Sequence, residues 1–231
     1  MRSYKTFNIG YARCITSIQT ATEMKQPDSP LTISGVSIDN LKDALTPIIR
    51  CNVKNNSREQ IAAYAVKHEA VFSHRAGTLS GSVAFNPVDR DQGMRPGDTR
   101  QVEIGGLNYG EMPEAITLSV DFVEFVSGTR WGPDTLKTGE TIDGVRAGAQ
   151  AESEVLLNVL MTRGPDALIR SLDSIKPEVD QNLPRSSEWL DGFRHGVGWI
   201  RERVRSKGPK HSEIETELRR SGLRIDGGEP R

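Results

Sequence analysis

Histidines are the side chains of this chain best suited to proton transfer or metal binding near neutral pH. His68, next to Glu69, and His74 form the one close set, whereas His195 and His211 stand far from them in the sequence. A zinc site needs three or four convergent ligands, and this spacing provides too few. We therefore predict no metal ligand here, and we interpret His68 as a strand residue and His74 as a loop residue.

An acidic pattern, Asp89 and Asp91 followed by Gly93, has the spacing of the start of a calcium loop. An EF-hand would continue with glycine and then glutamate where this chain has Met94 and Arg100. No phosphate-binding glycine loop, G-x-G-x-x-G, H-E-x-x-H or serine nucleophile elbow occurs in the sequence. The sequence therefore predicts no catalytic residue, no metal and no cofactor.

The two cysteines, Cys14 and Cys51, do not have the spacing of a metal or redox motif. We expect both to be unpaired thiols. Cys51 alternates in phase with Ile49 and Val53, which predicts a small core residue.

The residues with the best binding chemistry are Phe125, Arg130 and Trp131. Aromatic and arginine side chains dominate the energetics of protein interfaces, so these three form the candidate binding patch. The structural interpretation, which we favour for Trp131, is that it plugs the junction between the strands that precede it and the helices that follow.

The charge balance argues against a nucleic-acid partner, because Lys+Arg 30 and Asp+Glu 31 give a net charge of -1. A basic stretch, residues 201–207, lies at the end of a predicted helix, where cations complement the helix dipole. No apolar run approaches the ~20 residues of a membrane span, and the N-terminus lacks the apolar centre of a secretory signal. We expect a cytoplasmic protein, or an exported one if the true start codon lies upstream.

The stretch Ala115–Asp134 gives the clearest strand pattern, because apolar and polar residues alternate with a period of two. The phase then slips, so that Glu124 falls where an inward residue belongs. A β-bulge near Val123 would absorb this slip. Ser127 and Gly128 predict a tight turn before a short return strand that ends at Trp131.

Earlier segments complete a set of about seven short strands separated by turn signals, which favours an antiparallel β-sandwich over residues 31–134. Ser34 and Gly35 interrupt the first of them, which predicts an edge strand with a bulge. Residues 77–82 are expected to be a loop. Residues 1–30 have no sustained period and are predicted to be a mobile leader. The expected strands are Leu31–Ile33 with Val36–Ile38, Ile48–Lys54, Ile61–Phe72, Val83–Phe85 and Thr99–Ile104.

Three phrases, VKNNSREQIAAYAVKHEAVF, MRPGDTRQVEI and VDFVEFVSGTRWGPD, resemble strand motifs of bacterial immunoglobulin-like or fibronectin-III-like domains. The resemblance covers about residues 31–133. It implies an immunoglobulin-like sandwich and carries no activity, since that fold hosts many functions. The chain departs from true immunoglobulin domains because it lacks their paired core cysteines and the tryptophan between them.

From residue 138 the hydrophobic period becomes helical, and four helices are expected within residues 135–222. Gly164 with Pro165 should stop the first. Ser187 should cap the third, and Ser212 with Glu215 should cap the last. The tail, residues 223–231, is predicted to be disordered. The fold class is thus α+β: an antiparallel immunoglobulin-like β-sandwich followed by a C-terminal helical segment packed on or next to it.

Two glycine pairs lie on predicted helices, Gly144 with Gly148 and Gly192 with Gly196. Glycine within a helix costs ~1 kcal/mol relative to alanine. Four such residues therefore predict a close approach of helix backbones, either within the chain or between chains.

These observations favour a non-catalytic binding or protein-interaction module, with no nucleic acid and no transmembrane segment. One alternative is an enzyme or enzyme accessory subunit of hydrolase type with a loop-built site. A cleft that brings His68 or His74 to a carboxylate and a serine would favour it. The other alternative is a structural subunit of a cell-envelope assembly.

Overall fold

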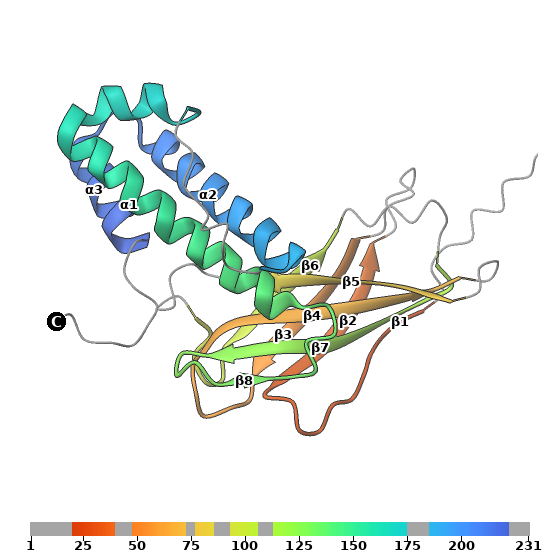
Figure 1. Ribbon diagram of the computed structural model, residues 1–231. Helices are drawn as coiled ribbons and strands as arrows, with labels where there is room; N and C mark the ends of the chain where they lie inside the picture. The colour runs from red at the N-terminus through yellow and green to blue at the C-terminus, as the bar shows by residue number, and fades with distance from the viewer. Residues whose placement is uncertain are drawn as a thin grey trace, which may run out of the picture.

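The computed structural model describes residues 20–39, 48–72, 77–85, 93–105, 113–174 and 185–221. Over these residues the chain forms an α+β fold in which the strands precede the helices, as the sequence predicts. Figure 1 shows the strands gathered in one body and the helices in a bundle that meets this body at one end. The elements are β1 (Thr20–Glu23), β2 (Leu31–Asp39), β3 (Ile48–Asn55), β4 (Ile61–Val71), β5 (Thr78–Phe85), β6 (Thr99–Ile104), β7 (Ala115–Phe125), β8 (Arg130–Trp131), α1 (Thr138–Ser171), α2 (Ser187–Lys207) and α3 (His211–Ser221).

The strands form two sheets. One has the order β1-β7-β4-β5, with β8 pairing β7, and the other has the order β2-β3-β6. All pairings are antiparallel except that of β1 with β7. Apolar side chains from both sheets meet in one core, so the strands form a two-sheet sandwich. Its members include Leu31, Ile49, Cys51, Val53, Ile61, Tyr64, Val66, Ile104, Ile116, Leu118, Val120 and Val123.

The predicted leader, residues 1–30, is wrong for its last part, because Thr20–Glu23 is strand β1. It pairs in parallel with the start of β7. The Gln26 side chain then continues the ladder: its Nε2 donates to the Val120 carbonyl (3.0 Å), and its Oε1 accepts from the Val120 amide (2.7 Å). These contacts use mainly backbone groups, so the sequence TATE carries no apolar period to reveal them. Residues 1–19 and 223–231 lie outside the described residues.

Strand β7 carries the predicted bulge, but at Asp121 rather than near Val123. In the register with β4, Ala65 is opposite Phe122 and Val66 is opposite Val120, which leaves Asp121 as the extra residue. Even-numbered apolar residues up to Val120 face the sandwich core, and Val123 and Phe125 do so after it. The bulge therefore turns Phe122 and Glu124 to the outer face of the sheet.

Two further strand predictions have different outcomes. The bulge in β2 is confirmed, since its register with β3 shifts between Ser34 and Ser37 and Gly35 has a φ of 61°. The predicted loop at residues 77–82 is wrong, because residues 78–82 belong to β5 and each of them pairs with β4. Their serine and glycine content resembles a loop, but the ladder with β4 holds them extended.

Helix α1 is interrupted at Gly164, whose backbone is non-helical (φ 77°, ψ 172°), and this confirms the predicted stop before Pro165. Helix α2 is capped by Ser186, one residue before the predicted cap, and its Oγ accepts from the Trp189 amide (3.1 Å). Helix α3 begins at His211, so Ser212 lies inside it and is not its cap.

Of the described helices, none combines the length and apolar character that a membrane span requires.

The four predicted glycines join α1 to α2 within the chain. A Cβ atom at Gly144 would lie 2.0 Å from the Trp189 carbonyl oxygen, and one at Gly148 would lie 2.1 Å from that of Phe193. The contacts are reciprocal, because Gly192 and Gly196 meet the α1 backbone just as closely. The paired positions rise together along both helices, so α1 and α2 run parallel (Figure 1).

Replacing Gly196 by alanine tests this contact. The new methyl group would lie 2.0 Å from the Val145 carbonyl oxygen, so overpacking should outweigh the usual gain in helix propensity. We expect the free energy of unfolding to fall by about 1–3 kcal/mol. Chemical denaturation measures this change.

Gly198→Ala is the matched control, because Gly198 lies on the same helix with open space around it. It should stabilise the protein by about 0.5–1 kcal/mol. Equal effects of the two substitutions would contradict the backbone contact.

Candidate functional site

The predicted patch residues do not gather on one surface. In the register of β7 with β8, Trp131 is opposite Val123 and Arg130 is opposite Glu124. Phe125 and Trp131 are half-buried and pack against the sandwich core. Arg130 points the other way, toward α1, because neighbouring residues of a strand face opposite sides of the sheet.

The junction between sandwich and helices is therefore built without Trp131, and its predicted role as the plug is wrong. Phe122 takes that place: its ring packs with Ala63 and Ala65 on β4 and with Ile142 on α1, all of them buried. The two alanines leave room for the helix against the sheet. A Cβ atom at Gly139 would lie 2.9 Å from the Phe122 ring, so the first turn of α1 sits directly on it.

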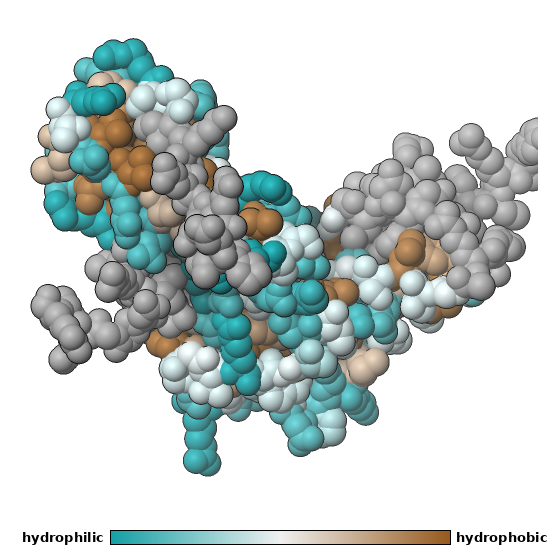
Figure 2. All heavy atoms as spheres, viewed as in Figure 1, coloured by the Kyte–Doolittle hydropathy of each residue, from teal (hydrophilic) through white to brown (hydrophobic). Residues whose placement is uncertain are grey.

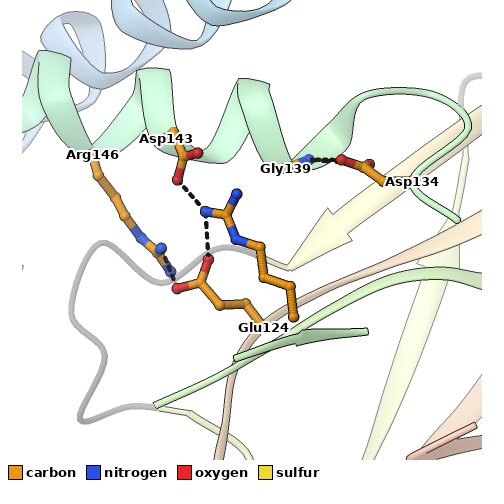
Figure 3. Close-up of polar contacts among 6 residues, drawn as sticks. Glu124, Asp134, Gly139, Asp143 and Arg146 are labelled. Carbon is orange, nitrogen blue, oxygen red and sulfur yellow. Dashed lines mark hydrogen bonds and ion pairs between the residues drawn. The ribbon is translucent and has the colours of Figure 1, made fainter. Parts of the chain in front are cut away.

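Charged side chains complete the junction (Figure 3). Arg146 Nη1 lies 2.6 Å from Glu124 Oε1, with only 3% and 1% of the two side chains exposed. Arg130 Nη2 lies 3.2 Å from the second oxygen of Glu124 and also pairs with Asp143. Two guanidinium groups thus face two carboxylates, which compensates the cost of burying Glu124.

Asp121, the bulged residue, holds the segment that leads into α1. Its carboxylate accepts from the Thr135 hydroxyl (2.8 Å), the Thr135 amide (3.2 Å) and the Leu136 amide (3.3 Å). The Asp134 carboxylate accepts from the Gly139 amide at the start of the helix (Figure 3). These hydrogen bonds fix where α1 begins.

A separate cleft opens between β5 and β6, which are edge strands of the two sheets on the same side of the sandwich. It has a volume of about 220 Å³. The rings of Tyr64 and Phe85 stack in it with centroids 5.3 Å apart. The Arg100 guanidinium lies over Phe85, 4.2 Å from the ring centroid. The described lining residues are Tyr64, Val83, Ala84, Phe85, Arg100, Gln101, Val102 and Glu103.

The described lining of this cleft is largely apolar and aromatic, with a guanidinium at its edge. Burial raises the pKa of Tyr64 to about 12, so its hydroxyl stays protonated at neutral pH. Glu103 is held by Arg50, whose Nε lies 3.1 Å from Glu103 Oε2. Apolar walls, an aromatic pair and the Arg100 guanidinium, which also donates to the Gly93 carbonyl (3.3 Å), complete the described lining.

Three of the four histidines, His68, His195 and His211, lie within the described residues. His68 is buried (5% exposed) with its imidazole against Gly81, and burial lowers its pKa. His195 and His211 are exposed on α2 and α3. His74 lies outside the described residues, as do Asp89, Asp91 and Cys14. Within the described residues no three His, Cys, Asp or Glu side chains lie close enough to hold a metal ion.

Cys51 and the basic stretch at residues 201–207 both have structural roles. Burial raises the pKa of the Cys51 thiol to about 11 and keeps it protonated. In the basic stretch of α2, Arg201 pairs with Glu152 of α1 (2.7 Å) and Arg203 pairs with Glu217 of α3 (2.5 Å). These arginines tie the three helices together, in addition to lying at a helix C-terminus as predicted.

Exposed apolar side chains do not form a broad patch among the described residues. They come from different elements, and on the face shown in Figure 2 hydrophobic residues form small separate areas among hydrophilic ones. The larger ones are Met24, Val71, Leu79, Val126, Met161 and Trp199. The sequence does not predict the β5–β6 cleft, because its pattern indicates a strand only over Val83–Phe85 and a loop over the first part of β5.

Breaking the buried pair tests the junction. Glu124→Ala removes the carboxylate that pairs with the buried Arg146 guanidinium, and it should lower the free energy of unfolding by about 3–5 kcal/mol in chemical denaturation. The double variant with leucine at positions 124 and 146 removes both charges and should recover most of this loss in stability. Glu103→Ala breaks the exposed pair with Arg50 and should cost at most about 1 kcal/mol. A double variant as unstable as the single one would disprove the charge argument.

The buried His68 predicts a dependence of stability on pH. Its pKa is below the ordinary 6.5 in the folded protein, so the unfolded chain binds more protons just below pH 6.5. Stability from this residue is present above pH 6.5 and falls with decreasing pH, by up to about 1.4 kcal/mol per pH unit. Unfolding free energies at pH 8 and pH 5 should therefore differ more in the wild type than in His68→Leu. The same pH dependence in both proteins would contradict this assignment.

Comparisons with known proteins end at the level of a weak structural likeness. No protein-family model matches the chain, and no curated protein matches it. A solved structure of a hypothetical protein from Peptoclostridium difficile 630 is 11% identical and aligns over 49% of this chain and 91% of its own. Its TM-score of 0.34 is too low to indicate a shared fold.

Proposed function

We propose that this chain is a non-catalytic binding module for a protein ligand, and that the ligand contacts the cleft between β5 and β6. The observation that carries the proposal is the stack of Arg100, Phe85 and Tyr64 in a cleft open to solvent. Arginine, tyrosine and phenylalanine side chains are enriched where proteins bind one another.

The size of the cleft supports a protein ligand over a small molecule. Small-molecule pockets have volumes of about 300–1,000 Å³, whereas this cleft has about 220 Å³. It can receive one large side chain. The rest of such a ligand would then lie along the strands that border the opening.

The lining also supports binding over catalysis. A hydrolase-type site needs a nucleophile and a base within hydrogen-bond reach. The described lining residues include no histidine and no serine, and their one carboxylate, Glu103, pairs with Arg50. His68, one of the two histidines named for the enzyme alternative, is buried with its imidazole against Gly81.

We further propose that the sandwich is of the immunoglobulin-like kind. Immunoglobulin-type sandwiches place the first, second and fifth strands in one sheet and the third, sixth and seventh in the other. Counted from β2, strands β2, β3 and β6 share one sheet, and β4, β7 and β8 share the other. The fourth strand, β5, joins the second sheet beside β4. This distribution supports the resemblance seen in the sequence, and such domains are widely used for binding.

A cleft-filling substitution tests the proposed function. A displayed library of random linear peptides is selected on the full chain, and the recovered peptides are synthesised and titrated. We expect Val102→Trp to weaken their binding at least about tenfold, since the indole fills the cleft that Val102 lines. Backbone amide shifts on binding should centre on β5 and β6.

Val36→Trp is the matched control, because Val36 packs against the same core from β2, at the far edge of the same sheet. Its binding should stay within about twofold of the wild type, and the thermal melting of both variants checks that they are folded. A failure to recover any binding peptide, or equal binding by the two tryptophan variants, would rule out the cleft as the binding site.

A further inference from the structure

Strand β5 presents an open edge. It ends the sheet order β1-β7-β4-β5, and no described strand pairs with its outer side. The outer backbone groups of such a strand can form a ladder with another extended chain.

The sequence of β5 lacks the features that protect edge strands from such pairing. Charged residues, prolines and bulges are the usual protection, and TLSGSVAF has no charge and no proline. Its register with β4 is also continuous from Thr78 to Phe85. The other long edges differ: β1 carries Glu23, β2 carries a bulge and Asp39, and β6 carries Arg100.

The register identifies which backbone groups of β5 point outward. The Glu114 amide donates to the Val71 carbonyl, so Val71 directs its backbone groups toward β7. In an antiparallel strand these directions alternate, so Ala70, His68 and Val66 direct theirs toward β5. Their partners on β5, which are Leu79, Gly81 and Val83, direct their backbone groups back toward β4. The residues between those partners direct their amides and carbonyls outward, and they are Thr78, Ser80, Ser82 and Ala84.

The cleft lies directly beneath this edge. An added strand would send alternate side chains toward the sandwich interior, where Phe85, Val83 and Val102 form apolar walls. In a second copy of this chain, Val83 and Phe85 of β5 pack against that copy's own core, and the one large apolar side chain that its β5 exposes is the aliphatic Leu79, so its β5 has no exposed aromatic side chain for the cleft. The edge and the cleft together therefore fit a separate extended segment.

Resting on the proposed function, we propose that β5 binds its partner by strand addition. The partner is an extended, uncharged peptide segment that hydrogen-bonds to the outward backbone groups of Ser80, Ser82 and Ala84. It places one large apolar or aromatic side chain in the β5–β6 cleft. Backbone pairing supplies affinity, and the cleft selects the side chain.

Two measurements on the full chain test the proposal, with the synthetic peptides from the displayed-library selection as probe. Ser80→Pro removes one outward amide and leaves the ladder with β4, and it should weaken binding about tenfold. Ser80→Ala keeps the amide and should bind within about twofold of the wild type. In the second measurement, the peptide is N-methylated at one residue at a time and titrated against the wild-type protein. Methylation should abolish binding at every second residue only.

The outcomes separate the two proposals. If Val102→Trp weakens binding but Ser80→Pro and alternate N-methylation do not, the cleft binds the ligand and strand addition is wrong. If no variant weakens binding, or no peptide is recovered, both proposals are wrong. If the ligand-free wild type sediments as a dimer and Ser80→Pro as a monomer, β5 pairs with a second copy and the peptide assignment is overturned. N-methylation uses wild-type protein, so it decides the question even if Ser80→Pro does not fold.

Discussion

Glu124 lies buried in β7, with the Arg146 guanidinium of α1 and the Arg130 guanidinium of β8 beside its carboxylate. A carboxylate taken out of water costs several kcal/mol unless an opposite charge and hydrogen bonds compensate it. The pair at 2.6 Å therefore couples the position of the helix to the register of the strand. The bulge at Asp121 is what turns Glu124 to that face, and the Asp121 carboxylate also holds the lead-in to α1. One local irregularity in one strand thus sets where the helical bundle joins the sandwich.

The helical bundle extends this placement away from the sheet. Helix α1 is anchored at its first turns by Phe122 and the charge network, and α2 then follows it in parallel through four glycines. Parallel neighbours need a return connection between them, and the kink at Gly164 begins that return. The ion pairs of Arg201 with Glu152 and of Arg203 with Glu217 fix the three helices farther along. The bundle therefore meets the sandwich at one end. The cleft lies between the edge strands β5 and β6.

The two ends of the mixed sheet differ in a way that bears on function. On the β7 side, β1 and β8 pair with the strand, and α1 packs on its outer face. On the β5 side, an uncharged strand borders a cleft lined by an aromatic pair and a guanidinium. The first side has the properties of a structural joint, and the second has those proposed for recognition.

The sequence by itself determined the elements whose side chains follow one local period. The alternation in β7, the stop at Gly164 and the close approach at the four glycines could all be predicted, because each depends on residues a few positions apart. The tertiary structure decided what depends on a partner far along the chain. Strand β1 exists because of a backbone ladder with β7, and β5 exists because β4 holds a serine- and glycine-rich segment extended. Of the three residues predicted as one patch, Arg130 faces away from Phe125 and Trp131, because adjacent strand residues face opposite sides. The cleft could not be predicted at all, since it lies between the edges of two sheets whose order no local pattern encodes.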